Sequence, residues 1–274
     1  MERFIGAPPF QWQGEINRKS EQWLGLVGWW TIPTAAPGLG VLDAARGAIV
    51  PFPAASANQP AFAIQPFAEQ IGRTLSFSAT AYTDANRDYI PIPTLSLGTE
   101  QTLAYWCAYN NYTSLSYGGV VFGYDNNYYF DWISGSTRYA VFGSGNAASV
   151  TSGISKGTMS HLAITRNGTS VQFYLNGRPD GAPQTLGANN ALLLSFIGHA
   201  TTVANGYYGL KGTLGDTRIY NRALKAAEIW QLYDPQTRWE LYRPPRPMVW
   251  WIPPVTTTSI IPQVRHHMAQ QGMA

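Results

Sequence analysis

The chain has few charged residues, a single cysteine and no long apolar run. Charged residues make up 12% of its 274 residues, about half of the usual share. Because Cys107 is the only cysteine, neither an intrachain disulfide nor a cysteine-based metal cluster can form. No apolar stretch is long enough to cross a bilayer, and the N-terminus lacks the pattern of a secretion signal. We therefore expect no membrane partner, and a product that stays in the cytoplasm or leaves it by another route.

Aromatic residues are abundant, at 14% of the chain with 10 Trp and 16 Tyr. This composition is typical of a β-rich domain whose core is packed with rings and whose surface is polar through Ser, Thr, Asn and Gln. The length allows one large all-β domain or two small ones. A net charge of +3 is too small and too evenly spread to indicate a nucleic-acid partner.

Short runs of strand-forming residues, separated by Gly, Asn and Ser turns, recur along the chain. We predict strands at residues 23–30, 74–78, 88–93, 102–109, 119–122, 128–133, 138–142, 161–166, 169–175 and 192–198. The pair around Asn167-Gly168 is the clearest hairpin, with the type I′ turn that Asn-Gly favours, and a second tight turn follows at Asn176-Gly177. Residues 31–68 are rich in Ala, Pro and Gly and predict loops and edge pieces. The spacing is typical of an all-β, two-sheet antiparallel sandwich or jelly roll.

One short helix is predicted in the segment Gly212–Tyr233, GTLGDTRIYNRALKAAEIWQLY. The first half alternates as a strand, with Asp216 and Arg218 on one face, and we interpret these two as a structural ion pair. The apolar spacing then changes to that of a helix, with Lys225 as a poor cap and Glu228 in the first turn. The Asp-Pro pair that follows should end the helix after about three turns.

These patterns divide the chain into an N-terminal arm (residues 1–22), a β-sandwich (23–233) and a Pro/Trp-rich C-terminal tail (234–274). The tail combines prolines of extended chain with large aromatic residues that need something to cover them. We predict that its aromatic side chains anchor the protein to its own sandwich or to a neighbouring subunit: Trp239, Tyr242, Trp250 and Trp251.

Five motifs, in order along the chain, resemble those of the LamG-like jelly-roll domains of the concanavalin A-like lectin/glucanase superfamily. They are Gly25–Trp30, Leu75–Phe77 with Asp88–Ile90, Thr102–Trp106, Ser160–Gly177 and Gly212–Tyr233. Two departures stand out: Gly215 replaces the first acid of a paired Asp, and Lys225 replaces the capping Ser. The stretch Tyr233–Tyr242, followed by Val249–Trp251, is similar to the tail of LamG-like proteins encoded by tailed bacteriophages and prophages.

Glycan-cleaving enzymes of the superfamily carry paired carboxylates on one strand, in patterns such as Glu-x-Asp-x-x-Glu. No such pattern occurs here, so we predict no catalytic residues and no enzyme. LamG-like relatives often bind calcium at the sandwich rim, and the resemblance makes Asp84 and Asp88, or Asp125 and Asp131, candidate calcium ligands. Ordinary turn chemistry explains these acids equally well, and we expect no other cofactor. His161 is expected to pack and hydrogen-bond rather than to act in catalysis.

Several tyrosines lie in or beside Gly- and Asn-rich loops, where a ring suits stacking on a sugar or contact with another protein. The candidate binding residues are Tyr112, Tyr117, Tyr124, Tyr128, Tyr207 and Tyr208. A rim that only completes the core is the alternative interpretation.

The sequence therefore predicts a non-enzymatic binding or structural protein. The first hypothesis is a virion surface component of a tailed phage, a head decoration or a fibre-associated protein, whose partners are other virion proteins or further copies of itself. The alternative is a stand-alone carbohydrate-binding lectin module, calcium-assisted or not, that recognises a cell-surface glycan.

Overall fold

The computed structural model describes residues 16–31, 40–53, 60–63, 74–78, 88–109, 117–124, 128–133, 137–142, 145–148, 157–200 and 208–242. Its contacts divide the chain into two units, Met1–Pro244 and Pro245–Ala274, and the described residues all belong to the first. Six predicted site residues lie outside the described residues: Tyr112, Tyr207, Asp84, Asp125, Trp250 and Trp251.

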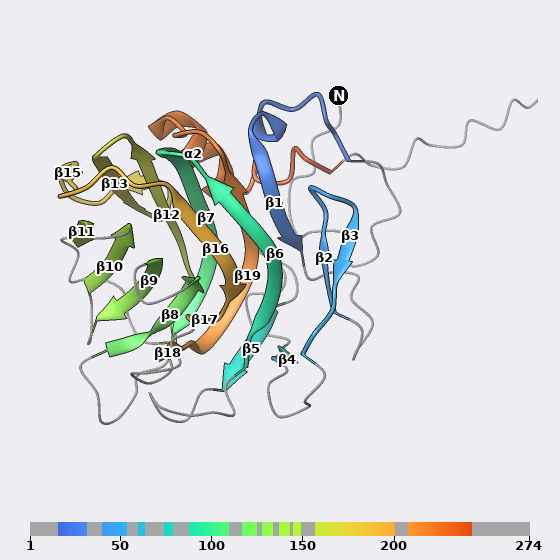
Figure 1. The fold of residues 1–274 in the computed structure, drawn as a ribbon. Coiled ribbons are helices and arrows are strands. Elements are labelled where there is room, and N and C mark those ends of the chain that lie inside the picture. Colours follow the sequence, from blue (N-terminus) through green and yellow to red (C-terminus); the bar gives the residue numbers. More distant parts are fainter. Residues whose placement is uncertain are drawn as a thin grey trace, which may run out of the picture. The chain divides into compact units, whose positions relative to one another are not determined.

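Two antiparallel sheets form the body of the first unit, with β6 and β16 in front of β7 and β19 in Figure 1. The larger sheet has eleven strands in the order β14-β13-β12-β7-β19-β1-β2-β3, with β15 beside β13, β5 beside β19 and β4 beside β5. Their bounds are β1 Leu26–Thr31, β2 Val41–Asp43, β3 Ala48–Val50, β4 Ala61–Ala63, β5 Thr74–Ser78, β7 Glu100–Tyr109, β12 Ser160–Asn167, β13 Ser170–Leu175, β14 Arg178–Pro179, β15 Gln184–Thr185 and β19 Lys211–Tyr220.

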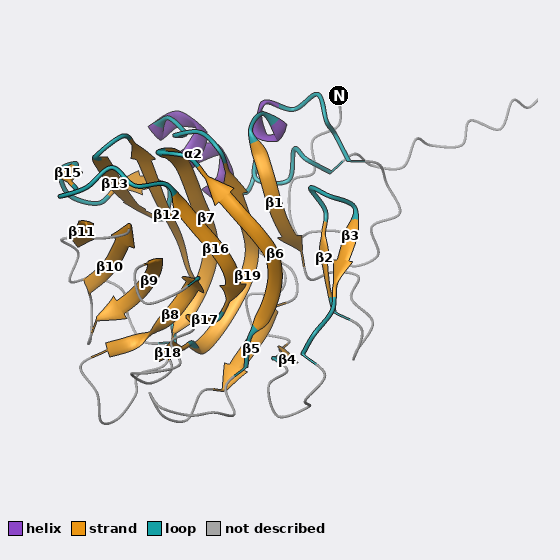
Figure 2. Ribbon diagram, in the orientation of Figure 1, coloured by secondary structure: helices purple, strands orange, loops and turns teal. Residues whose placement is uncertain are grey.

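The smaller sheet has six strands in the order β11-β10-β9-β8-β16-β6, and a third sheet pairs β17 with β18. Their bounds are β6 Ile90–Leu97, β8 Tyr117–Gly123, β9 Tyr128–Ile133, β10 Thr137–Phe142, β11 Gly145–Ala148, β16 Leu192–Ile197, β17 His199–Ala200 and β18 Tyr208–Gly209. The described helices are a 3-10 helix at Glu21–Trp23 and the α-helix α2 at Ala226–Tyr233 (Figure 2). The predicted fold class, an antiparallel jelly-roll sandwich with one short C-terminal helix, is confirmed. None of the described helices is long and apolar enough to span a membrane.

The core lies between the two sheets because alternate side chains of each strand point inward. In β6 the side chains of Ile90, Ile92, Leu95 and Leu97 are buried in this core, while those between them are more exposed. The ring of Tyr105 in β7 meets that of Phe122 in β8 edge-on, with centroids 5.2 Å apart. Tight interlocking of this kind fixes the register of both sheets.

The predicted hairpin exists, but its turn differs from the predicted type. Asn167 pairs with Ser170, so Gly168 and Thr169 are the two central residues of the turn. Gly168 has a φ of +62°, whereas Thr169 has no positive φ. A positive φ only at the first central residue is the pattern of a type II′ turn. The type I′ pattern occurs instead at Asn176-Gly177, where φ is +50° and +77°.

The first predicted strand, at residues 23–30, is wrong at its start. Ser20 caps the 3-10 helix by accepting a hydrogen bond from the Gln22 backbone at 3.2 Å, and Trp23 ends that helix. Gly25 then adopts a φ of +75°, a conformation that glycine tolerates and that breaks the extended run. Strand β1 therefore begins only at Leu26.

Helix α2 follows the sequence closely. It runs from Ala226 to Tyr233 with Lys225 as its N-cap, and the Lys225 side chain makes no cap hydrogen bond. The backbone N–H of Lys225 donates to Glu228 Oε2 at 2.8 Å instead, so the half of a capping box that Glu228 can supply is present. Ile229 and Leu232 are buried against Ala104 and Ala163 on the outer face of the larger sheet.

The segments on either side of the predicted sandwich also pack on this outer face. Trp239, Leu241 and Tyr242 form a buried cluster with Trp29, and Ile16 packs against it. Ile16 and Tyr242 form an antiparallel β-bridge, and the Asn17 N–H donates to the Leu241 carbonyl at 2.7 Å. Residues 16–24 and 234–242 are thus held together on the sandwich.

Candidate functional site

The outer face of the larger sheet is covered by other described parts of the chain to a greater extent than that of the smaller sheet. Helix α2 and residues 234–242 cover the outer face of the larger sheet. On β6 of the smaller sheet, Pro93, Thr94 and Ser96 are exposed, and on the neighbouring β16 the side chains of Leu193, Ser195 and Phe196 are half-buried. We call these six residues the β6–β16 face. Within the described part of the chain, no helix covers it.

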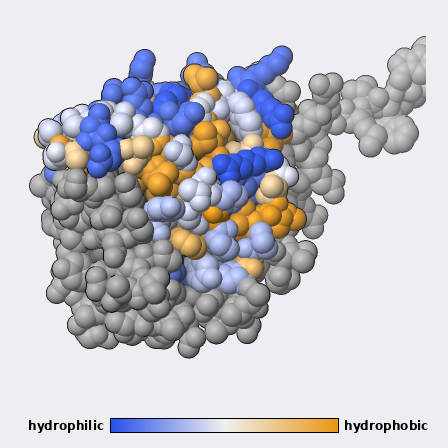
Figure 3. All heavy atoms as spheres, in the orientation of Figure 1, coloured by the Kyte–Doolittle hydropathy of each residue, from blue (hydrophilic) through white to orange (hydrophobic). Residues whose placement is uncertain are grey.

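Hydroxyl and ring groups occur together on the β6–β16 face. The hydroxyls of Thr94 and Ser195 are 2.9 Å apart and exposed, so both can also bond to a ligand. The half-buried Tyr89 ring packs edge-on against Phe196, with centroids 5.8 Å apart, and against His199, at 5.3 Å. Figure 3 shows apolar and polar side chains intermixed on the described part of the surface in this view. Rings beside hydroxyls are the groups that bind the C–H faces and the hydroxyls of a sugar.

Three of the predicted tyrosines belong to segments that meet at one end of this face. Phe196 of β16 pairs with Gly123 of β8, so Tyr124, which follows Gly123, lies at this end. Gly123 in turn pairs with Tyr129 of β9, which places Tyr128 at the same end of the sheet. Tyr208 of β18 pairs with Ala200, next to His199.

Tyr117 is separate from the others, at the far end of β8 opposite Ile133. Sequence reasoning missed Tyr89, Thr94, Ser195 and Phe196 as site residues. The available signals were Leu95 and Leu97, whose alternation places Thr94 and Ser96 outside, and the serine that interrupts the apolar run of β16. Ile90 and Ile92 alone would have placed Thr94 inside, because the register of β6 and β16 shifts between these two pairs of apolar residues.

The structure does not test the candidate calcium pairs, because Asp84 and Asp125 lie outside the described residues. The Asp88 side chain is buried, and its Oδ2 accepts hydrogen bonds from the Ser78 backbone N–H at 2.5 Å and the Ser78 hydroxyl at 2.7 Å. It therefore fixes the end of β5 to the segment before β6. Asp131 lies in β9. No group of three or more His, Cys, Asp or Glu side chains that could hold a metal occurs among the described residues.

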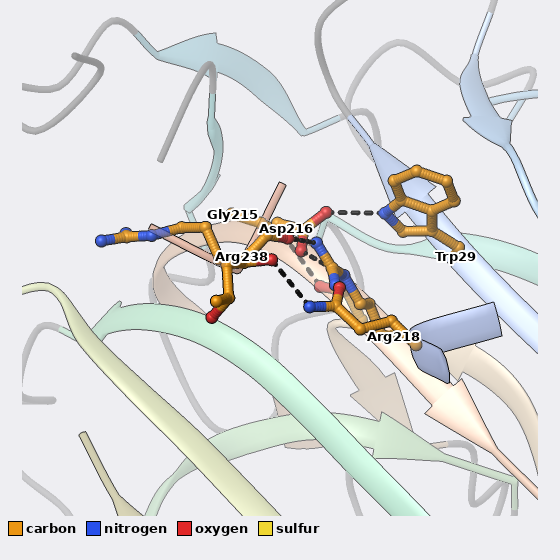
Figure 4. A network of polar contacts seen from close by, with 8 residues as sticks. Trp29, Gly215, Asp216, Arg218 and Arg238 are labelled. Carbon is orange, nitrogen blue, oxygen red and sulfur yellow. Dashed lines mark hydrogen bonds and ion pairs between the residues drawn. The ribbon is translucent and has the colours of Figure 1, made fainter. Parts of the chain in front are cut away.

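Asp216 and Arg218 form the predicted structural ion pair, with Arg218 Nε 2.8 Å from Asp216 Oδ2. Figure 4 shows the network around them. Trp29 Nε1 donates to Asp216 Oδ1 at 2.7 Å, and the two terminal nitrogens of Arg218 donate to Gln22 Oε1 and to the Arg238 carbonyl, each at 2.7 Å. Burial is the largest single influence on the pKa of Arg218 and lowers it, but the Asp216 carboxylate together with Tyr220 and Tyr242 outweighs burial, so the pKa of Arg218 is raised.

This network is closed to ligands because its members are buried and bonded to one another. It links the 3-10 helix, β1, β19 and the segment after α2. The register of β19 shifts between Leu214 and Thr217, around Gly215, the position of the missing acid. The Thr217 hydroxyl donates to the Gly215 carbonyl at 2.9 Å. The network therefore stabilises the fold and is no candidate for catalysis.

Two of the predicted anchor residues hold the chain to its own sandwich. Trp239 and Tyr242 are 4% and 6% exposed, and the Tyr242 ring meets Trp29 edge-on, with centroids 5.0 Å apart. The Arg238 guanidinium lies over Trp106, 5.0 Å from the ring centroid. Burial lowers the pKa of Arg238 to about 10. Neither Trp239 nor Tyr242 presents a free ring to a neighbouring molecule.

His161 lies in the same region, under α2. It is buried, 5.3 Å from the Trp106 ring, and its backbone N–H donates to Asn176 Oδ1 at 3.0 Å. These contacts are those of a packing residue, as the sequence predicts.

The fold and its surfaces define an antiparallel jelly-roll sandwich with one covered and one partly open sheet. The family described as the concanavalin A-like lectin/glucanases superfamily matches residues 84–230, which is more than half of the chain. The protein belongs to this superfamily. The search of curated proteins found no significant match.

Solved structures share the fold at low sequence identity. Domain 4 of AbnA, an extracellular arabinanase from Geobacillus stearothermophilus, in complex with arabinotriose, is 18% identical over 76% of this chain and 98% of that one, with a TM-score of 0.51. The binding domain of botulinum neurotoxin serotype G is 11% identical over 76% of this chain and 50% of that one, with a TM-score of 0.51. A Trypanosoma rangeli sialidase is 16% identical over 76% of this chain but only 32% of that one, with a TM-score of 0.51. The chain thus spans almost all of the arabinanase domain and half or less of the toxin domain and the sialidase.

Proposed function

We propose that this protein is a non-catalytic carbohydrate-binding module and that the β6–β16 face is its binding surface. The observation that carries the proposal is the contrast between the two sheets. The outer face of the larger sheet is closed by the chain itself, whereas the β6–β16 face presents a Thr–Ser hydroxyl pair beside a half-buried ring. Such a face suits a sugar, whose C–H groups pack on rings and whose hydroxyls need hydrogen-bond partners.

The structural comparisons support a binding module. The arabinanase domain, which this chain covers over most of its length, was solved with arabinotriose, and the toxin neighbour is itself a binding domain. The sialidase neighbour is an enzyme, but the chain spans only a third of it.

The composition of the two face strands argues against glycan cleavage. Glycosidases of the retaining and inverting types generally use two carboxyl groups on either side of the scissile bond. The segments Ile90–Leu97 and Leu192–Ile197 contain no Asp or Glu. A face without acids can bind a glycan but cannot protonate its leaving group in this way.

Titration calorimetry against a panel of neutral oligosaccharides, arabinotriose included, tests the proposal. Phe196→Ala removes the ring of the face and should weaken binding about tenfold, which corresponds to about 1.4 kcal/mol. Thr94→Arg should obstruct the same surface with an exposed side chain. Ile49→Ala is the matched control, because Ile49 is 62% exposed on β3 of the larger sheet. Absence of saturable binding by the unaltered protein, or equal binding by all three variants, would refute the proposal.

Calcium dependence is a separate part of the proposal. If Asp84, Asp88, Asp125 or Asp131 helps to hold an ion, a chelator should lower the affinity for the sugar and added Ca²⁺ should restore it. If the affinity for the sugar were unchanged in the presence of the chelator, the module would bind the sugar without calcium.

We propose a surface component of a tailed-phage virion, a head decoration or fibre-associated protein, as a second candidate function. The observation that favours it is the Ile16–Tyr242 bridge. Because these residues are paired, residues 1–15 and 243–274 join the sandwich at neighbouring positions, which suits a single attachment point for both arms. The resemblance of the segment after Tyr233 to phage-encoded tails agrees with this.

Sedimentation tests the attachment role by comparing the full chain with one that ends at Tyr242. A component that assembles through its arm, with virion proteins or with further copies of itself, should lose that assembly on truncation. A monomer in both cases, with no incorporation of the full chain into particles, would refute the virion hypothesis without affecting sugar binding by the face.

A further inference from the structure

An exposed tryptophan on α2 carries an arginine over its ring. Trp230 is 40% exposed, and the guanidinium carbon of Arg178 lies 5.8 Å from its ring centroid. Arg178 is exposed and opens β14, directly after the Asn176-Gly177 turn. The pair lies on the side of the larger sheet, away from the β6–β16 face.

The position of this indole is fixed by tight packing. The turn at Gly177 needs a positive φ, and a Cβ on Gly177 would lie 2.9 Å from both Trp230 and Tyr233. Tyr233 packs against Trp230 with centroids 5.5 Å apart and stacks on Trp106 at 5.8 Å. The indole is therefore held in one place although much of it faces solvent, which lowers the entropy cost of binding on it.

The guanidinium of Arg178 forms no ion pair within the described part of the chain. Arg218 and Arg222 both form ion pairs with carboxylates. Arg178 pairs with Leu175 through its backbone and contacts Trp230 through its side chain, and its guanidinium makes neither a hydrogen bond nor an ion pair with a described residue. Its planar fork of N–H donors matches a carboxylate in two-point geometry.

We infer that Arg178 and Trp230 form a second, separate sugar-binding site, specific for the carboxylate of an acidic sugar such as a uronic acid. The guanidinium binds the carboxylate, and the exposed part of the indole packs on the C–H groups of the ring. Residues 243–274 of this chain contain no Asp or Glu, so that segment offers no acidic side chain to occupy the site. The inference rests on the proposed function, because it takes the ligand to be a saccharide.

Calorimetry with tri-galacturonate and its neutral counterpart, galactotriose, tests the inference on the full chain. The unaltered protein should bind the acidic trisaccharide about tenfold more tightly, as one charged two-point contact allows. Arg178→Gln should remove this preference and leave the affinity for the neutral sugar unchanged. Arg178→Lys should restore only part of it, because lysine keeps the charge but not the fork.

Arg18→Gln is the matched control. Arg18 also lies over a tryptophan, 5.4 Å from the centroid of Trp23, but that ring packs in the buried cluster with Trp29 and Trp239. This variant should keep the full preference. Trp230→Leu should lose the preference, and an unchanged melting temperature would show that the loss is not one of folding.

The outcomes separate the inference from the proposed function. Equal affinity for the two sugars in the unaltered protein, or a preference that survives Arg178→Gln, would overturn the inference while neutral sugar binding still upholds the proposed function. Binding of neither sugar would overturn the inference directly. The proposed function would then fail as well if the wider neutral panel also showed no saturable binding.

Discussion

The indole of Trp29 donates a hydrogen bond to Asp216 at 2.7 Å, although the two residues are 187 positions apart. Asp216 also holds the guanidinium of Arg218, which lies 5.4 Å from the Trp29 ring centroid. A single buried carboxylate thus joins β1 to β19. It also neutralises the guanidinium of Arg218, which donates hydrogen bonds to Gln22 and to the Arg238 carbonyl.

Replacing this carboxylate should destabilise the protein severely. Asp216→Ala leaves the Arg218 charge buried and unpaired, and removal of one partner from a buried ion pair costs about 3–5 kcal/mol. Urea unfolding followed by circular dichroism would measure the change in the free energy of unfolding.

Glu228→Gln serves as the comparison, because the Arg222–Glu228 pair is partly exposed and such pairs contribute about 1 kcal/mol or less. If the two variants lost similar stability, the buried network could not be the main link between the sheet and the terminal segments.

The sequence predicts the local elements well because their signals lie within a few residues. Strand β9 has the predicted bounds, α2 ends at the predicted Asp-Pro pair, and the hairpin at Gly168 exists. Even so, the alternation of β19 shows only that Asp216 and Arg218 share a face. It does not reveal that Gln22 and the Arg238 carbonyl, from opposite ends of the chain, cover that face.

The candidate binding face shows the same limit. Thr94 and Ser195 are 101 positions apart and meet only because β6 pairs with β16. Alternation predicts that Ser195 points outward, but it is ambiguous for Thr94, because Ile90 and Ile92 place that position inside whereas Leu95 and Leu97 place it outside. It does not show that Thr94 and Ser195 are neighbours or that the larger sheet is the one that α2 covers. Contacts between distant segments depend on packing, which no local pattern encodes.

Gly177→Ala should destabilise the fold more than Gly168→Ala. Both glycines have a positive φ, which costs a residue with a side chain about 1–2 kcal/mol. A Cβ at position 168 meets open space, whereas one at position 177 would contact Trp230 and Tyr233. We expect a loss of about 1 kcal/mol at 168 and at least about 2 kcal/mol at 177, because overpacking adds to the backbone cost. If thermal unfolding showed the same loss of stability for both variants, α2 would have to shift without energetic cost to make room for the added methyl group.

Alkaline pH should destabilise the protein through its buried tyrosines. Burial raises the pKa of Tyr220 to about 12 from 10.0, although Arg218 opposes the shift, and burial also raises the pKa of Tyr242. Between pH 10 and 12 the unfolded chain loses this proton while the folded chain keeps it, so stability falls as pH rises. Two pKa units correspond to a loss of about 3 kcal/mol for Tyr220.

Urea unfolding at several pH values from 9 to 11 (about one unit on either side of an ordinary tyrosine) would measure this loss. Tyr220→Phe should reduce the slope of stability against pH and change stability little at neutral pH. An identical slope in the variant would mean that the Tyr220 hydroxyl does not titrate differently in the folded and unfolded chains.

Truncation should separate the part of the C-terminal segment that belongs to the sandwich from the part that does not. A chain ending at Tyr242 keeps the Ile16 bridge and the Arg238 carbonyl that accepts from Arg218, and the residues it loses beyond Pro244 form a separate unit. Its melting temperature should therefore stay close to that of the full chain.

A chain ending at Tyr233 should behave differently. It loses three buried side chains, those of Trp239, Leu241 and Tyr242, and burial of each is worth about 1.5–3 kcal/mol. It also exposes Trp29 and leaves Arg218 without one of its carbonyl acceptors. We expect it to unfold at a much lower temperature than the chain ending at Tyr242, or to fail to fold. Equal melting temperatures would mean that residues 234–242 rest on the sandwich without stabilising it, and that a functional boundary could be placed directly after α2.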